Sequence, residues 1–187
     1  MRRKKNKEFN NITIERVGSK GKSIGVADDG KTIIIDGGAP GDIVNILTTK
    51  QRKSYYQGKI TEFHKYSEIR TTPKCEHFGV CGGCKWQHIN YEEQLKFKQK
   101  EVENNLLRIG NLELPKITPI KAAKNDYFYR NKMEYSFSDS RWLSIEEIQS
   151  KKIIEEKNAL GFHIPGMWNK VVDIKKCWLQ EDFTNII

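Results

Sequence analysis

The chain lacks any apolar stretch long enough to cross a membrane, since a transmembrane helix needs about 20 consecutive apolar residues. Five of its first seven residues are Lys or Arg, but no apolar run follows them, so they do not form a secretory signal. Disulfides suit small secreted domains, and nothing in this sequence indicates secretion. We therefore expect a cytoplasmic protein with reduced thiols and no membrane association.

Cysteine is scarce, and the four cysteines form one tight triplet and one distant single. Cys75, Cys81 and Cys84 make the motif Cys-x5-Cys-Gly-Gly-Cys, and Cys177 stands alone far downstream. Three thiolates from one short loop and a fourth from a remote segment are a common way to hold an iron–sulfur cluster. Zinc sites with four cysteines more often use two Cys-x2-Cys pairs, of which this chain has one. Buried structural thiols and disulfides are the remaining alternatives.

The residues around the triplet fit a loop that wraps a bulky inorganic core. Gly82 and Gly83 leave the backbone free and allow close approach, and Pro73 stiffens the entry to the loop. His77 and His88 flank the loop. We interpret both histidines as packing or supporting residues rather than ligands, because four thiolates already complete such a site.

Positive charge is concentrated in the first part of the chain. The 187 residues carry a formal net charge of +9. Residues 1–74 hold 16 Lys and Arg against 8 Asp and Glu, a net charge of +8, whereas residues 75–187 hold 17 against 16. A basic module of this size indicates a polyanionic partner, most simply nucleic acid. Plain solubility is the alternative explanation.

Residues 10–68 have the pattern of five short strands after a basic tail at residues 1–9. Alternating or β-branched runs are separated by Gly, Asp and Pro turn signals. Five short strands in about 60 residues favour a small closed barrel. Lys50, Arg52 and Lys53 are candidates for phosphate contact on this barrel. The adjacent tyrosines at 55 and 56 either stack on bases or pack the barrel.

The rest of the chain mixes helices and strands. Asn90 can cap a helix with Glu93 three residues on, and Gly110 is a plausible stop. The apolar stripe of this helix is expected to be core. We predict strands at residues 117–120 and 127–138, and a charged surface helix at residues 144–156.

Two further strands, at residues 160–163 and 171–174, are expected to form a hairpin that delivers Cys177. Arg130 and Lys132 alternate along the strand predicted at 127–138, so they should share one face, with Asn131 on the other. We take these three residues and His163 as candidates for RNA or interdomain contact, the alternative being a solvated strand face.

Several of these segments resemble the RNA (uracil-5-)-methyltransferase family, and the resemblance covers nearly the whole chain. It rests on residues 73–88 (PKCEHFGVCGGCKWQH), 129–133 (YRNKM), 161–163 (GFH) and 171–177 (VVDIKKC), in the order of that family. Residues 10–68 resemble the TRAM domain of the same proteins. The tRNA-directed members are expected to lack both the TRAM domain and the cysteine loop, so the ribosomal RNA branch is the nearer resemblance.

The resemblance implies an α+β chain: a small five-stranded TRAM/OB-like β-barrel, then an α/β iron–sulfur domain at residues 69–187. It also implies a 4Fe-4S cluster on Cys75, Cys81, Cys84 and Cys177. The implied partner is ribosomal RNA, and the implied activity is 5-methyluridine formation in 23S rRNA. We expect the protein to be monomeric.

One departure from the family is an absence. Its members carry a C-terminal domain that binds S-adenosylmethionine and supplies a nucleophilic cysteine and a carboxylate base. This chain has no glycine-rich strand-to-helix turn for such a cofactor, and no cysteine remains after the four are assigned. We therefore expect an inactive N-terminal part, with S-adenosylmethionine bound and catalysis performed only in the full-length enzyme. The alternative is a stand-alone, metal-stabilised RNA-binding module, with iron–sulfur or zinc, that has no catalytic activity.

Overall fold

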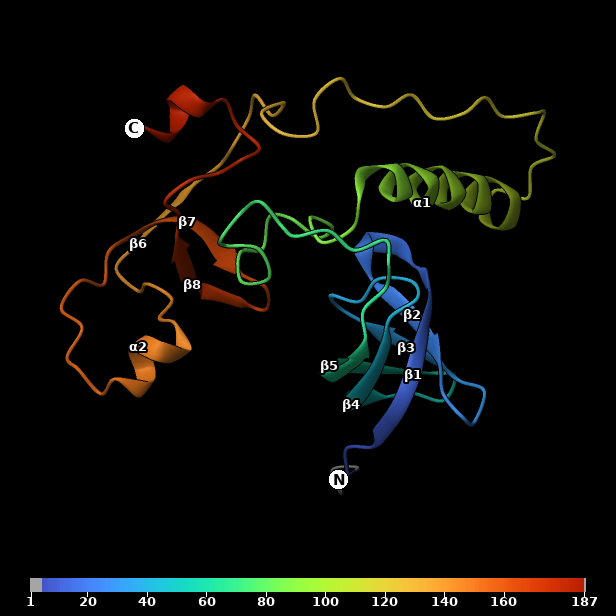
Figure 1. Cartoon of the computed structure of the whole chain (residues 1–187), viewed down its shortest axis with the longest axis horizontal. Helices are drawn as coiled ribbons and strands as arrows, with labels where there is room; N and C mark the ends of the chain where they lie inside the picture. Colours follow the sequence, from blue (N-terminus) through green and yellow to red (C-terminus); the bar gives the residue numbers. More distant parts are fainter. Residues whose placement is uncertain (1–4, 187) are drawn as a thin grey trace. The chain divides into compact units, whose positions relative to one another are not determined.

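The computed structural model describes residues 5–186, which fold into two compact units (Figure 1). The first unit runs to Thr72 and resumes over His88–Ala122. The second consists of Pro73–Gln87 and the chain from Ala123 onward. The units thus alternate along the sequence, and the domain boundaries at residues 10–68 and 69–187 stay a prediction. Residues 1–4 of the expected basic tail lie outside the described residues, and the first strand already begins at Glu8.

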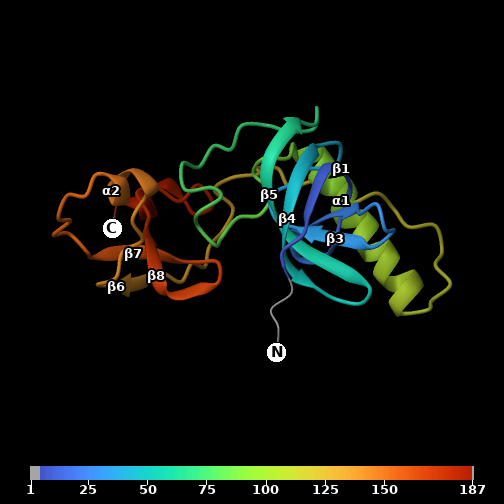
Figure 2. The same cartoon turned by 90° about the horizontal axis from the view of Figure 1, so that it is seen from below.

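The first unit is built on a closed five-stranded barrel, which Figure 2 shows from a second side. The strand order is β1-β2-β3-β5-β4, and β1 pairs with β4 to close it. The β3–β5 pair is parallel and the other pairs are antiparallel. The strands are β1 Glu8–Val17, β2 Ser23–Val26, β3 Thr32–Ile35, β4 Ile43–Gln51 and β5 Tyr55–Lys65, with a 3₁₀ turn at Ser19–Gly21. The predicted five-stranded barrel is confirmed.

The barrel interior is filled by alternate residues of its strands, as the period of two in a β-strand requires. In β4, Val44, Ile46 and Thr48 are buried, while their neighbours are less so. Gly58 in β5 must be glycine, because a Cβ there would lie 2.5 Å from the Ile46 Cγ2 atom. The core cluster consists of Ile12, Ile14, Ala27, Ile33, Ile35, Val44, Ile46 and Tyr56.

Tyr56 belongs to this core, and its hydroxyl reaches a polar group at the surface. The side chain is only 2% exposed, so it packs the barrel and is not a platform for stacking. Its hydroxyl donates to the Asp29 carboxylate at 2.7 Å and accepts from Lys31 and Lys7. The hydrogen bond from Lys31, and then that from Tyr56, lowers the pKa of Asp29 to about 2.

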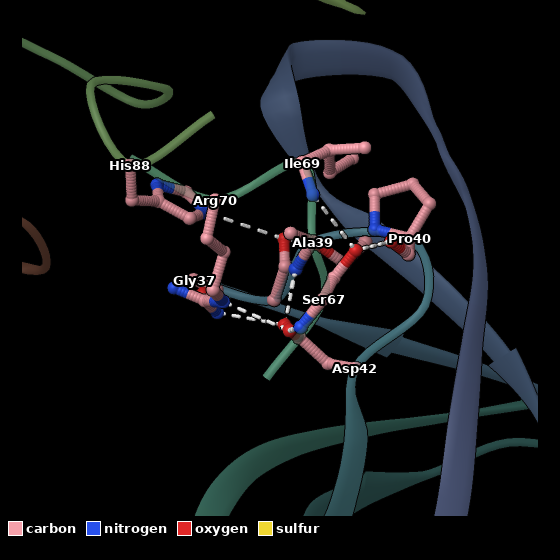
Figure 3. A network of polar contacts seen from close by, with 10 residues as sticks. Gly37, Ala39, Pro40, Asp42, Ser67, Ile69, Arg70 and His88 are labelled. Carbon is pink, nitrogen blue, oxygen red and sulfur yellow. Dashed lines mark hydrogen bonds and ion pairs between the residues drawn. The ribbon is translucent and has the colours of Figure 1, made fainter. Parts of the chain in front are cut away.

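A buried carboxylate, Asp42, ties the chain that leaves β5 to the barrel (Figure 3). Arg70 donates to it twice, from Nε to Oδ1 at 2.8 Å and from Nη2 to Oδ2 at 2.7 Å. The backbone N–H groups of Ala39 and Ser67 donate to Oδ2 and Oδ1 at 2.6 and 2.9 Å. Burial raises the pKa of Asp42, but the hydrogen bonds from Arg70, Ala39 and Ser67 outweigh it, so the pKa is lowered.

The segment that carries Arg70 forms a short two-stranded stem with the chain that enters the first helix. Arg70 pairs with Ile89 in an antiparallel bridge, and the Thr71 N–H donates to the His88 carbonyl at 3.0 Å. The Asn90 N–H donates to the Ile69 carbonyl at 2.9 Å. The cysteine loop, residues 73–87, lies between the two strands of the stem.

The helix after the stem, α1 Tyr91–Asn104, begins as the sequence predicted but does not bury its apolar stripe. The Asn90 side chain accepts from the Glu93 N–H at 3.0 Å, and a π-helical turn at Asn105–Ile109 continues the helix to Gly110. No residue of α1 is buried, and Val102 is 55% exposed. The expectation that this stripe is core is wrong for the described residues, because an amphipathic pattern does not specify what covers it.

The second unit contains a three-stranded antiparallel sheet of order β6-β7-β8. Its strands are β6 Ser136–Ser138, β7 Ala159–Ile164 and β8 Met167–Asp173. The predicted hairpin is therefore confirmed. The helix predicted from Ser144 has the expected capping box with Glu147, but α2 Ile145–Gln149 ends well before residue 156. A short 3₁₀ helix, Asp182–Asn185, follows Cys177.

One predicted strand is wrong, and another is correct only at its C-terminal end. Residues 117–120 form no strand, and Pro119 within them cannot donate a ladder hydrogen bond. Of residues 127–138, only Ser136–Ser138 is a strand, although Arg130 makes an isolated parallel bridge with Gln180. No helix in residues 5–186 is long and apolar enough to cross a membrane.

The Asp42–Arg70 pair gives the first testable prediction. Replacing Asp42 by alanine leaves the Arg70 guanidinium and two backbone donors without their acceptor, and should destabilise the barrel by about 3–5 kcal/mol. Asp36→Ala is the matched control, because that carboxylate is 69% exposed in its ion pair with Lys22 and should cost less than about 1 kcal/mol. Hydrogen exchange of the β4 amides measures both effects, and equal protection in the two variants would contradict the prediction.

The effect should also depend on pH with a defined sign. The pKa of Asp42 is lowered in the folded state, so its contribution is fully present above the unfolded value of about 3.9. That contribution is lost as the pH falls through the lowered folded value. The difference in β4 protection between the unsubstituted protein and Asp42→Ala should therefore be constant near neutrality and narrow below about pH 4.

Candidate metal centre

All four cysteines line one cavity of about 370 Å³ in the second unit. Cys75, Cys81 and Cys84 are half-buried on the loop, and Cys177 is buried four residues after the end of β8. All four are free thiols, so the structure contains no disulfide among them. The triplet and the distant cysteine predicted as one ligand set therefore come together around a single space.

The loop is shaped by its own turns and by the β7–β8 hairpin. The Cys81 N–H donates to the His77 carbonyl at 2.9 Å, and the Lys175 N–H donates to the His77 Nε2 atom at 3.1 Å. Gly82 lies against the hairpin so closely that a Cβ there would be 2.7 Å from the His163 carbonyl oxygen. His77 thus supports the loop, and Gly82 permits its approach to the hairpin.

Cys177 is fixed by the short helix that follows it. The Asn185 Oδ1 atom accepts from the Cys177 N–H at 2.8 Å and from the Gln180 Nε2 at 3.0 Å. The Asn185 Nδ2 donates to the Cys177 carbonyl at 3.2 Å. The Tyr135 hydroxyl forms hydrogen bonds with the side chains of Cys177 and Gln180. Burial, followed by the effects of Cys177, raises the pKa of Tyr135 to about 12.

Hydrogen-bond donors also face two sulfurs of the loop. The Gly83 N–H donates to the Cys81 Sγ at 3.4 Å, and the Gln87 Nε2 donates to the Cys84 Sγ at 3.3 Å. The Gln87 Oε1 accepts from the Cys75 N–H at 3.2 Å. The sequence analysis missed Gln87, Tyr135 and Asn185 as parts of the site. Only Gln87 carried a signal, because it lies three residues after Cys84.

The electrostatics of the thiols favour a cationic occupant. Burial raises the pKa values of Cys75, Cys81 and Cys84, and interaction with neighbouring cysteines raises each of them further. Four thiolates together in this space therefore need compensating positive charge, which a metal centre supplies. The chemistry of the donor set thus fits a thiolate-ligated metal group.

Four cysteines can hold either a single zinc ion or an iron–sulfur cluster. A zinc ion bound by four cysteines at about 2.3 Å would hold the sulfurs about 3.8 Å apart. Within residues 5–186, no group of three or more His, Cys, Asp or Glu side chains is arranged to hold a metal ion. Ligation by the four cysteines stays a prediction.

Basic side chains surround the same cavity. Arg130, Lys132 and Lys176 line it, together with one carboxylate, Glu134, which pairs with Lys132 at 2.9 Å. The Lys74 and Lys176 ammonium groups lie 4.2 and 4.4 Å from the ring centroid of Trp178, within the range of cation–π attraction. Lys176 also pairs with the Asp182 carboxylate.

The two histidines predicted as supporting residues lie in different units. His77 lines the cysteine cavity, whereas His88 is buried in the first unit with its Nε2 3.4 Å from the Gly38 carbonyl oxygen. Burial lowers the pKa of both histidines.

The predicted RNA-contact residues fall into separate groups. Lys50, Arg52 and Lys53 are exposed where β4 turns into β5. Arg130 and Lys132 are exposed and line the cysteine cavity, whereas Asn131 lines a neighbouring cavity that Arg130 also borders. These residues do not form the predicted strand, so its alternation of faces does not apply to them. His163 is exposed in β7, and its Nε2 lies 3.1 Å from the Ser136 Oγ. RNA contact by any of these residues stays a prediction.

Comparisons with known proteins agree with this architecture. Residues 3–61 match the family model of the TRAM domain. A protein of Bacteroides thetaiotaomicron named "Uncharacterized RNA methyltransferase" is 45% identical over 90% of this chain and 37% of its own length. A protein of the same name from Porphyromonas gingivalis is 41% identical over the same shares. The chain belongs to a family of RNA methyltransferases that carry a TRAM domain.

A solved structure shares the fold. The tRNA (uracil-54, C5)-methyltransferase of Pyrococcus abyssi, in complex with S-adenosyl-L-homocysteine, aligns with a TM-score of 0.50 and 23% identity. The alignment covers 93% of this chain and 34% of that one. The Pyrococcus abyssi enzyme therefore contradicts the expectation that tRNA-directed members lack the barrel. The fold alone does not distinguish enzymes that act on ribosomal RNA from enzymes that act on transfer RNA. The chain spans about a third of the length of the curated relatives it matches.

The two glycines of the Cys-Gly-Gly-Cys motif should differ in their tolerance of alanine. Gly82→Ala forces the loop away from the His163 carbonyl and should destabilise the second unit by about 1–3 kcal/mol. Gly83→Ala is the control, because its Cβ meets only the Cys81 sulfur at 3.5 Å. All four tryptophans lie in the second unit, so their fluorescence during urea unfolding reports on it. Equal midpoints for the two variants would contradict the close packing at Gly82.

Proposed function

We propose that this chain is the RNA-binding part of an S-adenosylmethionine-dependent methyltransferase that forms 5-methyluridine in 23S rRNA, acting as a cytoplasmic monomer. The observation that supports RNA binding is the combination of a TRAM barrel with four cysteines around one cavity. The choice of 23S rRNA rests on the resemblance of residues 73–88 to the ribosomal RNA branch. Relatives named RNA methyltransferase extend well beyond the matched segment. The S-adenosyl-L-homocysteine in the fold neighbour supports the choice of methyl donor.

The proposed reaction assigns the chemistry to residues outside this chain. Carbon 5 of uracil is a poor nucleophile, so a thiolate first adds to carbon 6 and makes the ring an enolate. Carbon 5 then takes the methyl group from the sulfonium, which leaves as the thioether S-adenosylhomocysteine. A base removes the proton at carbon 5, and the thiolate departs. The target base must be extruded from its RNA structure, and the units described here contribute by holding the surrounding RNA.

The same proposal places a 4Fe-4S cluster on Cys75, Cys81, Cys84 and Cys177. When bound, it supplies a cationic core that joins the loop to the segment after β8. The methyl transfer needs no electron, so we assign the cluster a structural function. The chain's own contribution is the set of N–H and O–H donors that face Cys81, Cys84 and Cys177.

The two groups of basic residues would serve RNA binding in different ways. The exposed Lys50, Arg52 and Lys53 belong to a segment of high net positive charge, so they suit phosphate contacts that do not depend on sequence. Arg130 and Lys132 belong to a nearly neutral segment and suit local recognition of RNA shape. Asn131, which follows Arg130 in the chain, and the exposed His163 provide further hydrogen-bonding groups.

Exchange of this chain into a relative tests the activity. The matching segment of the Bacteroides thetaiotaomicron protein is replaced by this chain, and the exchanged protein is incubated with labelled S-adenosylmethionine and purified RNAs. We expect label at carbon 5 of uridine in 23S rRNA from the intact relative and from the exchanged protein. This chain alone should transfer no label.

Four results would contradict the proposal in different ways. Label in tRNA alone would exclude the ribosomal substrate. Label from the relative but none from the exchanged protein would show that this chain does not serve the same function. Labelling by this chain alone would reveal an active site within it, whereas RNA binding without any transfer by either longer protein would favour the stand-alone binding module.

A salt titration tests the predicted phosphate contacts on the barrel. If Lys50, Arg52 and Lys53 each contact one phosphate, replacing all three by glutamine should flatten the log–log salt dependence of RNA binding by about two units. The control replaces Lys151, Lys152 and Lys157, which are exposed in the second unit, with the same change in net charge. Filter binding of a single-stranded RNA measures both slopes. Equal slopes for the two triple variants would show that the positive charge of the barrel serves only solubility.

A further inference from the structure

Gln87 connects the two ends of the cysteine loop through both atoms of its side-chain amide. Its Oε1 accepts from the Cys75 backbone N–H at 3.2 Å, and its Nε2 donates to the Cys84 sulfur at 3.3 Å. The side chain is partly buried and lines the cavity with both cysteines. Because an N–H group cannot accept and a thiolate cannot donate, only this orientation of the amide satisfies both partners.

We infer that Gln87 is a positioning residue for the cluster, which holds the Cys84 sulfur by an N–H···S hydrogen bond while it closes the loop at Cys75. The inference rests on the proposed assignment of a cluster to the four cysteines. Hydrogen bonds to the ligating sulfurs orient the ligands and, for iron–sulfur clusters, set the reduction potential.

The surroundings of the other sulfurs make Gln87 distinctive. Cys81 receives its hydrogen bond from the backbone N–H of Gly83, which forms within the loop itself. Cys177 is bonded by the Tyr135 hydroxyl, from a different segment of the second unit. Gln87 alone among these donors also accepts from the backbone of a second cysteine. A change at this one side chain therefore affects both the geometry and the charge of the triplet.

The two functions of the amide can be separated by substitution. Gln87→Glu keeps an oxygen that can accept from Cys75, but it removes the donor to Cys84 and places a negative charge beside the sulfur. Gln87→Met removes both hydrogen bonds without adding charge, in a side chain of similar length. Gln149→Glu makes the same charge change at an exposed position at the end of α2 and serves as the control.

The test uses the full chain, purified without oxygen and reconstituted with iron and sulfide. The unsubstituted protein and Gln149→Glu should contain equal iron and sulfide and release iron to a chelator at equal rates. Gln87→Glu and Gln87→Met should release iron about 10-fold faster or more. The reduction potential, followed by electron paramagnetic resonance, should be more negative in Gln87→Glu than in the control. Tryptophan fluorescence in urea, recorded on the metal-free proteins, establishes that each variant folds.

The possible failures are distinguishable. If the unsubstituted protein binds no iron, or binds stoichiometric zinc instead, the proposed cluster itself is wrong. If it binds the cluster but both Gln87 variants match Gln149→Glu in iron release and potential, Gln87 does not position the cluster. If only Gln87→Met is altered, the side chain closes the loop and does not act on the Cys84 sulfur. Should Gln87→Glu fail to fold, Gln87→Met decides whether Gln87 contributes to cluster retention.

Discussion

The buried carboxylate of Asp42 is the constraint on which the first unit depends. Taking a carboxylate out of water is costly, and a buried ion pair is weak evidence of net stabilisation. Here both oxygens accept two hydrogen bonds each, from Arg70, Ala39 and Ser67. The turn before β4 and the chain after β5 must both be in place to bring these donors together. The network therefore selects a geometry more than it adds free energy.

That geometry determines where the cysteine loop starts and ends. Arg70 is fixed by Asp42 and stacks over Phe63 and Tyr66, with its guanidinium carbon 5.0 and 5.4 Å from their ring centroids. The same residue pairs with Ile89, so the two strands of the stem are held beside each other. A loop whose ends are already joined loses less conformational entropy when it orders around a metal group. The stem thus prepares the loop without supplying a ligand.

Sequence patterns predicted the parts of this structure that depend on local spacing. The strands of the barrel alternate buried and exposed residues, and the Asn90 cap is a local hydrogen bond, so both could be read from neighbouring residues. The stripe of α1 and the strand at 117–120 were wrong, because burial and pairing depend on partners that the local pattern does not specify. Asn185 could not be found, since its contact with Cys177 arises from the turn of a short 3₁₀ helix. The motif located the triplet, but not the amide that links Cys75 to Cys84.

The net charge of residues 75–187 does not show how the charged side chains are arranged in space. Residues 75–187 have almost no net charge, yet Arg130, Lys132 and Lys176 gather around the four cysteines. In the proposed metal centre, thiolates in a partly buried space would attract these cations more strongly than the same groups would in water. Positive charge that compensates thiolates is not fully available to phosphate. In the proposed function, non-specific attraction of RNA therefore falls mainly to the barrel, and Arg130 and Lys132 would link the electrostatics of the proposed metal centre to RNA bound beside it.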